Sequence, residues 1–256
     1  MTELSGVAYG VQWLRSVLFI GQMYVAMLIC AVIWFIPALF SREYAYSAVH
    51  AYCRWVRFSA RVICGLRSEI RGPVPTGEVI IAAKHQSFFD IIMIISAVPR
   101  PRFIMKSILR WAPLLGWYAL RIGCIPVDRG KRGKAIKQMV DGVRNSPDPG
   151  QLIIYPQGTR VAPGKSLPYK VGPAVLYDQL AQPCIPAAAN VGVFWPRHGF
   201  YRRPGLAVVE FLDPIAPGMK QRPFLARLES EVEAASDRLM AEAGFPVIDQ
   251  KAEQHG

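Results

Sequence analysis

The sequence predicts an α/β fold: a mixed, largely parallel sheet flanked by helices, preceded by N-terminal membrane-associated helices. Three observations predict it. From about residue 72, short apolar runs rich in β-forming residues alternate with helical patterns, which is typical of a largely parallel sheet. A long uncharged stretch stands before this alternation. Finally, 52% of the residues are hydrophobic and 19% are charged, which excludes a disordered chain.

The first element that we expect is an apolar helix over about residues 17–40. The stretch reads VLFIGQMYVAMLICAVIWFIPALF and carries no charge between Arg15 and Arg42. It is long enough to cross a bilayer, and its apolar core is longer than that of a cleaved signal peptide. Two arrangements stay open: a membrane span, or a hairpin with the following helix that dips into one leaflet. At this length a buried core helix is the less favoured interpretation.

A basic amphipathic helix is expected next, over about residues 44–66, with polar and apolar positions on opposite sides. The polar side is formed by Ser47, His50, Arg54, Arg57 and Arg61. The apolar side is formed by Val49, Cys53, Val56, Ala60 and Ile63. This pattern beside an apolar segment favours the lipid headgroup layer over an ordinary domain helix. More arginines follow the apolar segment than precede it, which predicts that the rest of the chain lies in the cytoplasm.

Residues 1–68 are therefore expected to form the membrane segment, residues 69–245 the α/β domain and residues 246–256 a polar tail. The strands are expected at residues 78–83, 102–106, 123–127, 151–155, 184–191 and 206–212. The helices are expected at residues 87–97, 107–121, 131–145, 171–181 and 222–243.

The net charge of +12 indicates an anionic partner: nucleic acid, an anionic membrane surface or a phosphorylated substrate. Nucleic acid is disfavoured because no recognised motif and no aromatic platform accompany the arginines. The five cysteines are scattered and form no CxxC pair, which disfavours both a disulfide framework and a zinc site. No metal is expected, since histidine is scarce and no ligand spacing is present.

Two polar residues interrupt the most apolar part of the domain, VIIAAKHQSFFDIIMII, residues 79–95. His85 is expected in the turn at the carboxyl end of a buried strand, where open α/β sheets bind ligands. Ser87 is expected to cap the next helix, whose first turn contains Asp90. A carboxylate on one imidazole nitrogen leaves the other free to take a proton from a hydroxyl. The structural alternative makes Asp90 the far half of a capping box.

Three basic patches also follow predicted strands. FIMKSILR brings Lys106 to a strand end, GCIPVDRGKR brings Arg129, and LIIYPQGTR brings Arg160 behind Gly158 and Thr159. Cations and glycine-containing turns at the carboxyl ends of adjacent strands are typical of a phosphate site. Because no G-x-S-x-G elbow supplies a serine nucleophile, the nucleophile is expected to be a hydroxyl of the substrate.

In their order, these blocks resemble the glycerolipid acyltransferase family of the bacterial 1-acyl-glycerol-3-phosphate acyltransferase (PlsC) type. HQSFFD matches the H-x4-D block with His85 and Asp90, and GCIPVDR matches the second block, which ends in Arg129. YPQGTR matches the third block, usually written F-P-E-G-T-R, and IPAAANVG matches the fourth with Pro186. The resemblance covers about residues 72–215.

The resemblance implies transfer of a fatty acyl group from acyl-CoA or acyl carrier protein to the free hydroxyl of 1-acyl-sn-glycerol-3-phosphate, giving phosphatidic acid. His85, oriented by Asp90, would deprotonate that hydroxyl, and backbone N–H groups near the helix start would stabilise the oxyanion. Arg129, Arg160 and Lys106 would hold the phosphate. The resemblance also implies a bacterial inner membrane, with the catalytic domain facing the cytoplasm. The bilayer, the lysophospholipid and the acyl donor are the expected partners, and no cofactor is expected.

One position departs from the family pattern. Gln157 stands where the family has glutamate, and glutamine keeps a similar reach but loses the charge. Gln157, Gly158, Thr159 and Pro186 are expected to bind substrate or to support the site. Two alternatives stay open: the same chemistry on lyso-ornithine lipid or glycerol-3-phosphate, and a non-catalytic, membrane-anchored lipid-binding protein.

Overall fold

The computed structural model describes residues 6–128, 132–144 and 149–246, and its centre is a seven-stranded sheet. The strand order is β1-β7-β6-β2-β5-β3-β4, and neighbouring strands are parallel except β6 and β7. The strands are β1 (Leu66–Arg71), β2 (Val79–Ala83), β3 (Pro101–Lys106), β4 (Ile125–Val127), β5 (Gln151–Ile154), β6 (Cys184–Ala189) and β7 (Gly205–Phe211). The predicted mixed, largely parallel sheet is confirmed.

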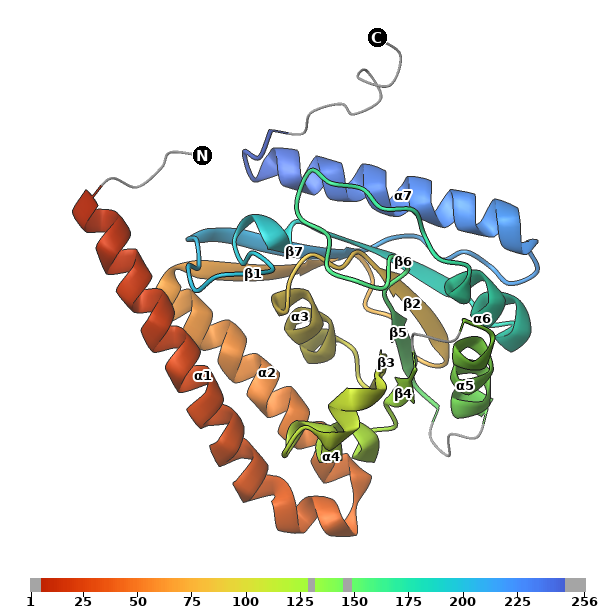
Figure 1. Ribbon diagram of the computed structural model, residues 1–256, viewed down its shortest axis with the longest axis horizontal. Helices are drawn as coiled ribbons and strands as arrows, with labels where there is room; N and C mark the ends of the chain where they lie inside the picture. Colours follow the sequence, from red (N-terminus) through yellow and green to blue (C-terminus); the bar gives the residue numbers. More distant parts are fainter. Residues whose placement is uncertain (1–5, 129–131, 145–148, 247–256) are drawn as a thin grey trace.

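Helices cover both faces of this sheet (Figure 1). The α-helices are α1 (Gly6–Phe40), α2 (Arg42–Cys64), α3 (Phe89–Ala97), α4 (Leu115–Arg121), α5 (Arg132–Arg144), α6 (Gly172–Leu180) and α7 (Gln221–Glu242). Two short 3-10 turns are η1 (Ser107–Trp111) and η2 (Val191–Val193). Side chains alternate between the two faces of a strand. Accordingly Ile81 and Ile153 belong to the cluster with α1–α4, whereas Ile80 and Leu152 belong to the cluster with α5–α7.

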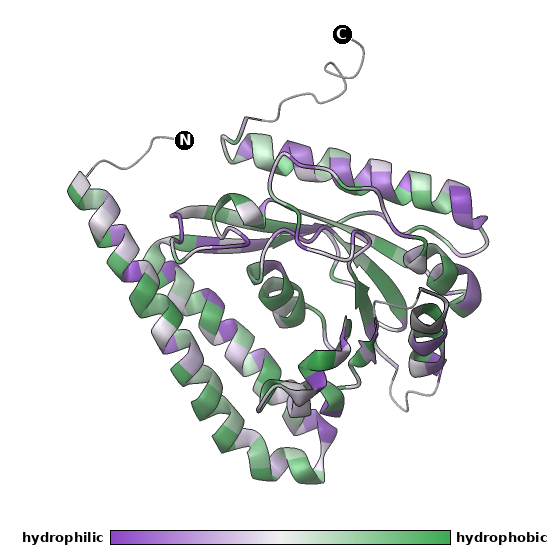
Figure 2. Cartoon of the chain, viewed as in Figure 1, coloured by the Kyte–Doolittle hydropathy of each residue, from purple (hydrophilic) through white to green (hydrophobic). Residues whose placement is uncertain are grey.

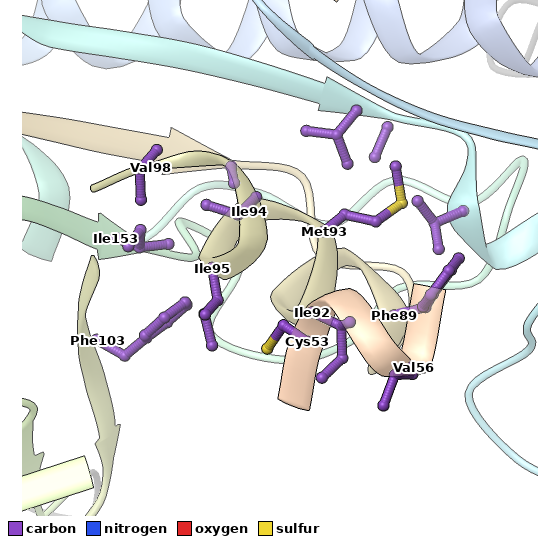
Figure 3. Packing of buried hydrophobic residues seen from close by; sticks show 14 of the residues in the cluster. Cys53, Val56, Phe89, Ile92, Met93, Ile94, Ile95, Val98, Phe103 and Ile153 are labelled. Atoms are coloured by element: carbon purple, nitrogen blue, oxygen red, sulfur yellow. The ribbon is translucent and has the colours of Figure 1, made fainter. Parts of the chain in front are cut away.

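Helix α3 lies directly against the sheet, between the strands and α2 (Figure 3). Ile92 lies beside Cys53 of α2, and Ile95 points toward Phe103 of β3. Its residues are almost all apolar, and a helix that is apolar all round is stable only when buried all round. The rigid packing of α3 fixes the turn that precedes it, which contains His85.

Helices α1 and α2 form a hairpin outside α3, and α1 shows a long apolar outer surface (Figure 2). Exposed apolar residues recur on α1 at intervals of three, four or seven positions: Val7, Val11, Leu14, Leu18, Val25, Leu28, Val32, Ile36 and Leu39. In the most apolar window only 17% of residues are buried. By length and composition α1 is the one helix of the described chain that qualifies as a membrane span, which alone is weak evidence.

Both ends of α1 are bound to the α/β domain. Near its start, Gln12 Nε2 donates to the carbonyl of Arg202 at 2.8 Å. Near its end, Arg121 of α4 donates to the carbonyls of Ala38 and Leu39 at 2.9 and 3.0 Å. A 35-residue helix is roughly 52 Å long, which is more than the hydrocarbon thickness of about 30 Å. If α1 crossed the bilayer, its two ends, and the parts of the domain bound to them, would lie on opposite sides of the membrane. This geometry therefore favours a helix lying along the domain.

Helix α2 is packed differently from the expectation for an interfacial helix. Cys53, Val56 and Ala60, on its apolar side, are buried in the core with α3. Arg57, on its basic side, donates to the hydroxyls of Ser68 and Ser96 at 2.8 and 2.9 Å. The apolar face thus belongs to the protein core, and the prediction that it faces lipid is wrong for these residues.

Most predicted elements are present, with two differences. β1 was not predicted, because LRSEIR has no alternation of apolar and polar residues strong enough to signal a strand. The boundary expected between residues 68 and 69 falls inside β1. The helix expected over 107–121 is interrupted: Leu114 has a positive φ of 61°, and η1 and α4 lie on either side of it.

Candidate active site

The carboxyl ends of three adjacent strands bring most of the predicted site residues to one edge of the sheet. β2 leads into His85, its neighbour β5 leads into the turn that contains Gly158 and Arg160, and the next strand, β3, ends at Lys106. Because neighbouring strands are about 4.8 Å apart, the end of β3 lies roughly 10 Å from that of β2. Arg129 lies outside the described residues.

His85 and Asp90 are in direct contact. His85 Nδ1 lies 2.9 Å from Asp90 Oδ1, and the Asp90 side chain is fully buried whereas that of His85 is 14% exposed. An ionised carboxylate only accepts hydrogen bonds, so the proton of a neutral imidazole resides on Nδ1 and the Nε2 lone pair is free. This arrangement can take a proton from a substrate hydroxyl.

Asp90 also holds the turn in which His85 lies. Its Oδ2 accepts from the backbone N–H groups of Gln86 at 2.9 Å and Ser87 at 2.7 Å. The catalytic and the capping interpretations of Asp90 are therefore compatible, since Oδ1 contacts His85 and Oδ2 accepts from the backbone of the turn. The N-cap is Phe88, and the Ser87 hydroxyl accepts from the N–H of Phe89 at 3.1 Å. The expected Ser87 cap is thus wrong by one residue.

The same contacts limit which N–H groups could stabilise the oxyanion. The backbone N–H groups of Gln86, Ser87 and Phe89 at the helix start already donate to side chains within the turn. The expectation of an oxyanion donor near the helix start therefore stays a prediction for the other N–H groups of this segment.

Tyr155 fixes the plane of the imidazole. Its ring stacks on that of His85, with centroids 3.9 Å apart and planes inclined by 20°. Burial, together with the charge of Asp90, raises the pKa of Tyr155 well above its ordinary value, so the phenol stays neutral at physiological pH. His85 is thus held at its edge by Asp90 and on one face by Tyr155.

The turn after Tyr155 requires a glycine at position 158. Gly158 has a φ of +69°, and a Cβ placed there would lie 2.6 Å from Lys170 Nζ. The backbone N–H of Lys170 donates to the carbonyl of Pro156 at 3.0 Å, which holds the Lys170 segment across the turn. Lys170 is therefore an additional cation beside Gly158 and the half-buried Thr159.

Arg160 lies on the exposed side of this turn. Its guanidinium donates to the carbonyl of Arg197 at 3.3 Å, and Arg197 donates back to the carbonyl of Arg160 at 3.0 Å. Two guanidinium groups are thereby brought together at the surface. Lys106 is exposed at the end of β3. Arg160, Arg197, Lys170 and Lys106 give this edge of the sheet a positive charge.

Gln157 points away from His85, into a polar cluster. Its Nε2 donates to the carbonyl of Leu167 at 3.3 Å and lies 3.5 Å from Glu233 Oε1 of α7. The other oxygen of Glu233 accepts from Lys84, whose side chain is 1% exposed. Gln157 thus connects the turn after β5 to the segment that contains Leu167 and to α7.

Pro186 lies within β6, paired with Ala82 of β2, and is buried. The next residue, Ala187, accepts a backbone hydrogen bond from Lys84 at 2.8 Å. Pro186 therefore supports the end of β2, and it lies in the sheet, not at the open edge with Arg160.

Two hollows mark the described surface. An apolar one of about 120 Å³ lies between α1, α2, α3 and α4, and its lining includes Phe88 and Ile91, just after the turn that contains His85. A polar one of about 360 Å³, lined by Arg102 and Arg144, lies at the opposite edge of the sheet, where the strands begin. Among residues 6–128, 132–144 and 149–246, no three His, Cys, Asp or Glu side chains are grouped to hold a metal ion.

Sequence reasoning missed three contributors: the ring of Tyr155, the cation of Lys170 and the carboxylate of Glu233. Tyr155 lies within YPQGTR, which matches the third block, whereas Lys170 lies ten residues after this segment. A lysine at the end of an otherwise apolar strand signals a buried counterion. No local pattern, however, identifies a partner 149 residues away.

The sequence of this chain is similar to those of known acyltransferases. A family model described as Acyltransferase matches residues 66–190. A 1-acyl-sn-glycerol-3-phosphate acyltransferase of Pseudomonas aeruginosa is 28% identical over 243 residues, which cover 91% of this chain and 92% of the relative. The Saccharomyces cerevisiae protein of the same name is 32% identical over 143 residues, covering 54% of this chain and 47% of the relative.

The fold also matches a solved structure. The crystal structure of the 1-acyl-sn-glycerophosphate acyltransferase PlsC from Thermotoga maritima superposes with a TM-score of 0.76, covering 89% of this chain and 95% of the other, at 20% identity. At this identity the match concerns the fold alone. Together with the sequence relatives and the H-x4-D geometry, the comparisons confirm that this chain is similar to the glycerolipid acyltransferase family.

Proposed function

We propose that this protein transfers a fatty acyl group from acyl-CoA or acyl carrier protein to the free hydroxyl of 1-acyl-sn-glycerol-3-phosphate, giving phosphatidic acid. The single observation that carries the proposal is the 2.9 Å contact between His85 Nδ1 and Asp90 Oδ1 at the open edge of the sheet. Relatives that match most of this chain are named 1-acyl-sn-glycerol-3-phosphate acyltransferases, and these names support 1-acyl-sn-glycerol-3-phosphate as the acceptor.

In this mechanism His85 Nε2 takes the proton of the acceptor hydroxyl as its oxygen attacks the thioester carbonyl. Asp90 stabilises the imidazolium that forms. The tetrahedral intermediate collapses by breaking the carbon–sulfur bond, and His85 returns the proton to the leaving thiolate. The products are the new ester and the free thiol, and His85 is again neutral.

The positive edge of the sheet supports a phosphorylated acceptor. Arg160 and Lys170 lie at the turn after β5, and Lys106 lies at the end of β3, so phosphate bound between them would be near His85. Arginine binds phosphate through two parallel hydrogen bonds, and lysine acts as a point charge. We propose that these side chains, with Arg129, hold the acceptor phosphate.

The apolar hollow beside Phe88 and Ile91 supports a site for an acyl chain. It opens next to the catalytic turn, and its lining is almost entirely hydrocarbon, including Ala31 and Met27 of α1 and Val49 of α2. An acyl chain there would leave its thioester or ester near His85. Its position between the hairpin and α3 also connects it to the outer surface of α1.

We further propose that the outer face of α1 lies in the membrane surface with the helix axis in the plane. Replacing Leu28, Val32 and Ile36 by serine is expected to weaken binding to vesicles of anionic phospholipid at least tenfold, because each exposed side chain loses about 1–2 kcal/mol of burial. Val74→Ser, an exposed valine away from α1, is the matched control and should bind normally. Unchanged binding of the triple variant would contradict the in-plane arrangement.

The acceptor is tested with purified protein, both acyl donors and a panel of acceptors: 1-acyl-sn-glycerol-3-phosphate, glycerol-3-phosphate and lyso-ornithine lipid. Activity on the first acceptor, lowered about 1,000-fold in His85→Ala, is the expected result. Activity confined to lyso-ornithine lipid would overturn the phosphate acceptor. Activity of His85→Ala equal to that of the wild type would overturn the mechanism.

A further inference from the structure

The residues on either side of His85 both contact α7. Along the end of β2 the side chains alternate: Ile81, Ala83 and His85 face α3, whereas Ile80, Ala82 and Lys84 face the side covered by α7. Gln86 continues the second series, and its Nε2 lies 3.5 Å from Met240 Sδ. Figure 1 shows α7 lying over this face of the sheet. The catalytic turn is therefore held from behind by α7.

The strongest of these contacts is an ion pair. Lys84 donates to Glu233 Oε2, and the side chains are 1% and 20% exposed, respectively. A lysine ammonium that is almost completely removed from water requires a counterion at close range. Within the described chain, the ion pair formed by Lys84 is with Glu233.

Glu233 also joins this lysine to the turn after β5. Its Oε1 accepts from the Tyr169 hydroxyl at 2.9 Å and lies 3.5 Å from Gln157 Nε2. Gln157 is the position where the family pattern has a glutamate. The neutral amide of Gln157 and the carboxylate of Glu233 are therefore neighbours, and this carboxylate binds the buried Lys84.

This carboxylate comes from outside the part of the chain that matches the family blocks. The acyltransferase family model ends at residue 190, whereas α7 is Gln221–Glu242. A glutamate at position 157 would bring a second carboxylate about 3.5 Å from Glu233 Oε1, and so beside the carboxylate that binds Lys84. The local charge can thus be the same with the carboxylate on either element.

We propose that Glu233 is a positioning residue for His85, which supplies from α7 the negative charge that Gln157 lacks. The inference rests on the proposed acyl transfer through His85. Without this charge Lys84 must move toward solvent, and because Lys84 and His85 are adjacent in the chain, the imidazole moves relative to Asp90. A neutral residue at position 157 is then compatible with catalysis, because Glu233 of α7 carries the negative charge instead.

The first experiment compares Glu233→Gln with Glu231→Gln. The two glutamates lie on the same helix, but Glu231 pairs with Arg227 at the exposed surface, which makes it a matched control. Glu233→Gln is expected to lower kcat about 10- to 100-fold with little change in KM, since a displacement of about 1 Å costs a rate of this size. Glu231→Gln should keep wild-type kcat. A Glu233→Gln protein that unfolds at lower temperature but keeps kcat would overturn the proposal.

The second experiment restores the charge at the other position. Gln157→Glu alone is expected to lower activity several-fold, because two carboxylates then lie about 3.5 Å apart. The double variant Gln157→Glu/Glu233→Gln has one carboxylate again and should recover at least tenfold over Glu233→Gln. If Glu233→Gln does not fold, the double variant decides alone: near wild-type kcat supports the proposal, and an inactive folded protein contradicts it.

A third readout does not depend on the substrate. The rate at which diethyl pyrocarbonate modifies His85, followed by mass spectrometry, reports its exposure and its contact with Asp90. We expect a several-fold change in Glu233→Gln, none in Glu231→Gln and recovery in the double variant. If the wild type acylates none of the acceptors, the proposed function fails, yet this rate still tests whether Glu233 positions His85; an unchanged rate overturns that role.

Discussion

His85 and Lys84 are neighbours in the chain, and each is paired with a carboxylate, but the pairs lie on opposite faces of β2. His85 contacts Asp90, five residues away on α3, whereas Lys84 contacts Glu233, 149 residues away on α7. The first pair is at the open edge and includes a ring that is 14% exposed. In the second pair the cation is 1% exposed. In the proposed mechanism the first pair transfers the proton, and the second pair holds the turn in which this transfer takes place.

The difference teaches how a strand end can carry both roles. The alternation of side chains along β2 sends successive residues to opposite faces, so a single backbone segment is fixed from both. A proton carrier must change its charge during turnover, and it therefore needs a partner but also access to substrate. The buried lysine never needs to change its charge, so complete burial beside a fixed carboxylate suits it.

The largest expected effect comes from removing the imidazole. His85→Ala should lower kcat about 1,000-fold, because general base catalysis by a positioned side chain contributes about 100- to 10,000-fold. Thermal unfolding should change little, since Asp90 keeps its two backbone hydrogen bonds. The exposed His198 provides the control: His198→Ala should keep wild-type kcat. Equal losses in both variants would remove the basis for assigning His85 as the base.

Asp90→Asn is expected to lower kcat about 100-fold and to destabilise the protein as well. An asparagine has one acceptor oxygen where the carboxylate uses two, for His85 and for the backbone of Gln86 and Ser87. Either the imidazole adopts the wrong tautomer or the turn loses its hydrogen bonds. The kcat and the midpoint of thermal unfolding should therefore both fall, unlike in His85→Ala. A loss of activity without loss of stability would show that the capping contacts contribute little.

Tyr155 tests how much the ring contact adds to the His85–Asp90 pair. Tyr155→Phe keeps the stacked ring and should leave kcat within about threefold of the wild type. Tyr155→Ala removes a contact of about 0.5–1.5 kcal/mol, so kcat should fall up to about tenfold. Steady-state rates of the two variants separate the ring from its hydroxyl. A Tyr155→Phe protein as impaired as Tyr155→Ala would assign the effect to the hydroxyl instead.

The same contrast explains what could be predicted from the sequence. His85, Asp90 and the strand before them were predicted because all the information lies within VIIAAKHQSFFD: an apolar run, a turn and a helix start. Gly158 and Arg160 were predicted for the same reason. Glu233 was not, because α7 reads only as an amphipathic helix, and pairing across 149 residues depends on the packing of the whole sheet. The environment of the apolar side of α2 was predicted wrongly, because an apolar helix face can pack equally well against lipid or against α3.

The smallest expected effect concerns Glu229, which lies near the Lys84–Glu233 pair. Burial, and next the charge of Glu233, raises the pKa of Glu229, one turn earlier on α7. A carboxyl whose pKa is raised by folding opposes folding once it ionises, so this cost is absent below the ordinary value of about 4.3 and grows as pH rises through the raised pKa. Glu229→Gln should therefore stabilise the protein by a few tenths of a kcal/mol at pH 7, and by nothing measurable at pH 4. Urea unfolding at both values measures it. A variant less stable than wild type at pH 7 would mean that Glu229 also helps Glu233 to neutralise Lys84, which would make the charge behind His85 a property of two carboxylates.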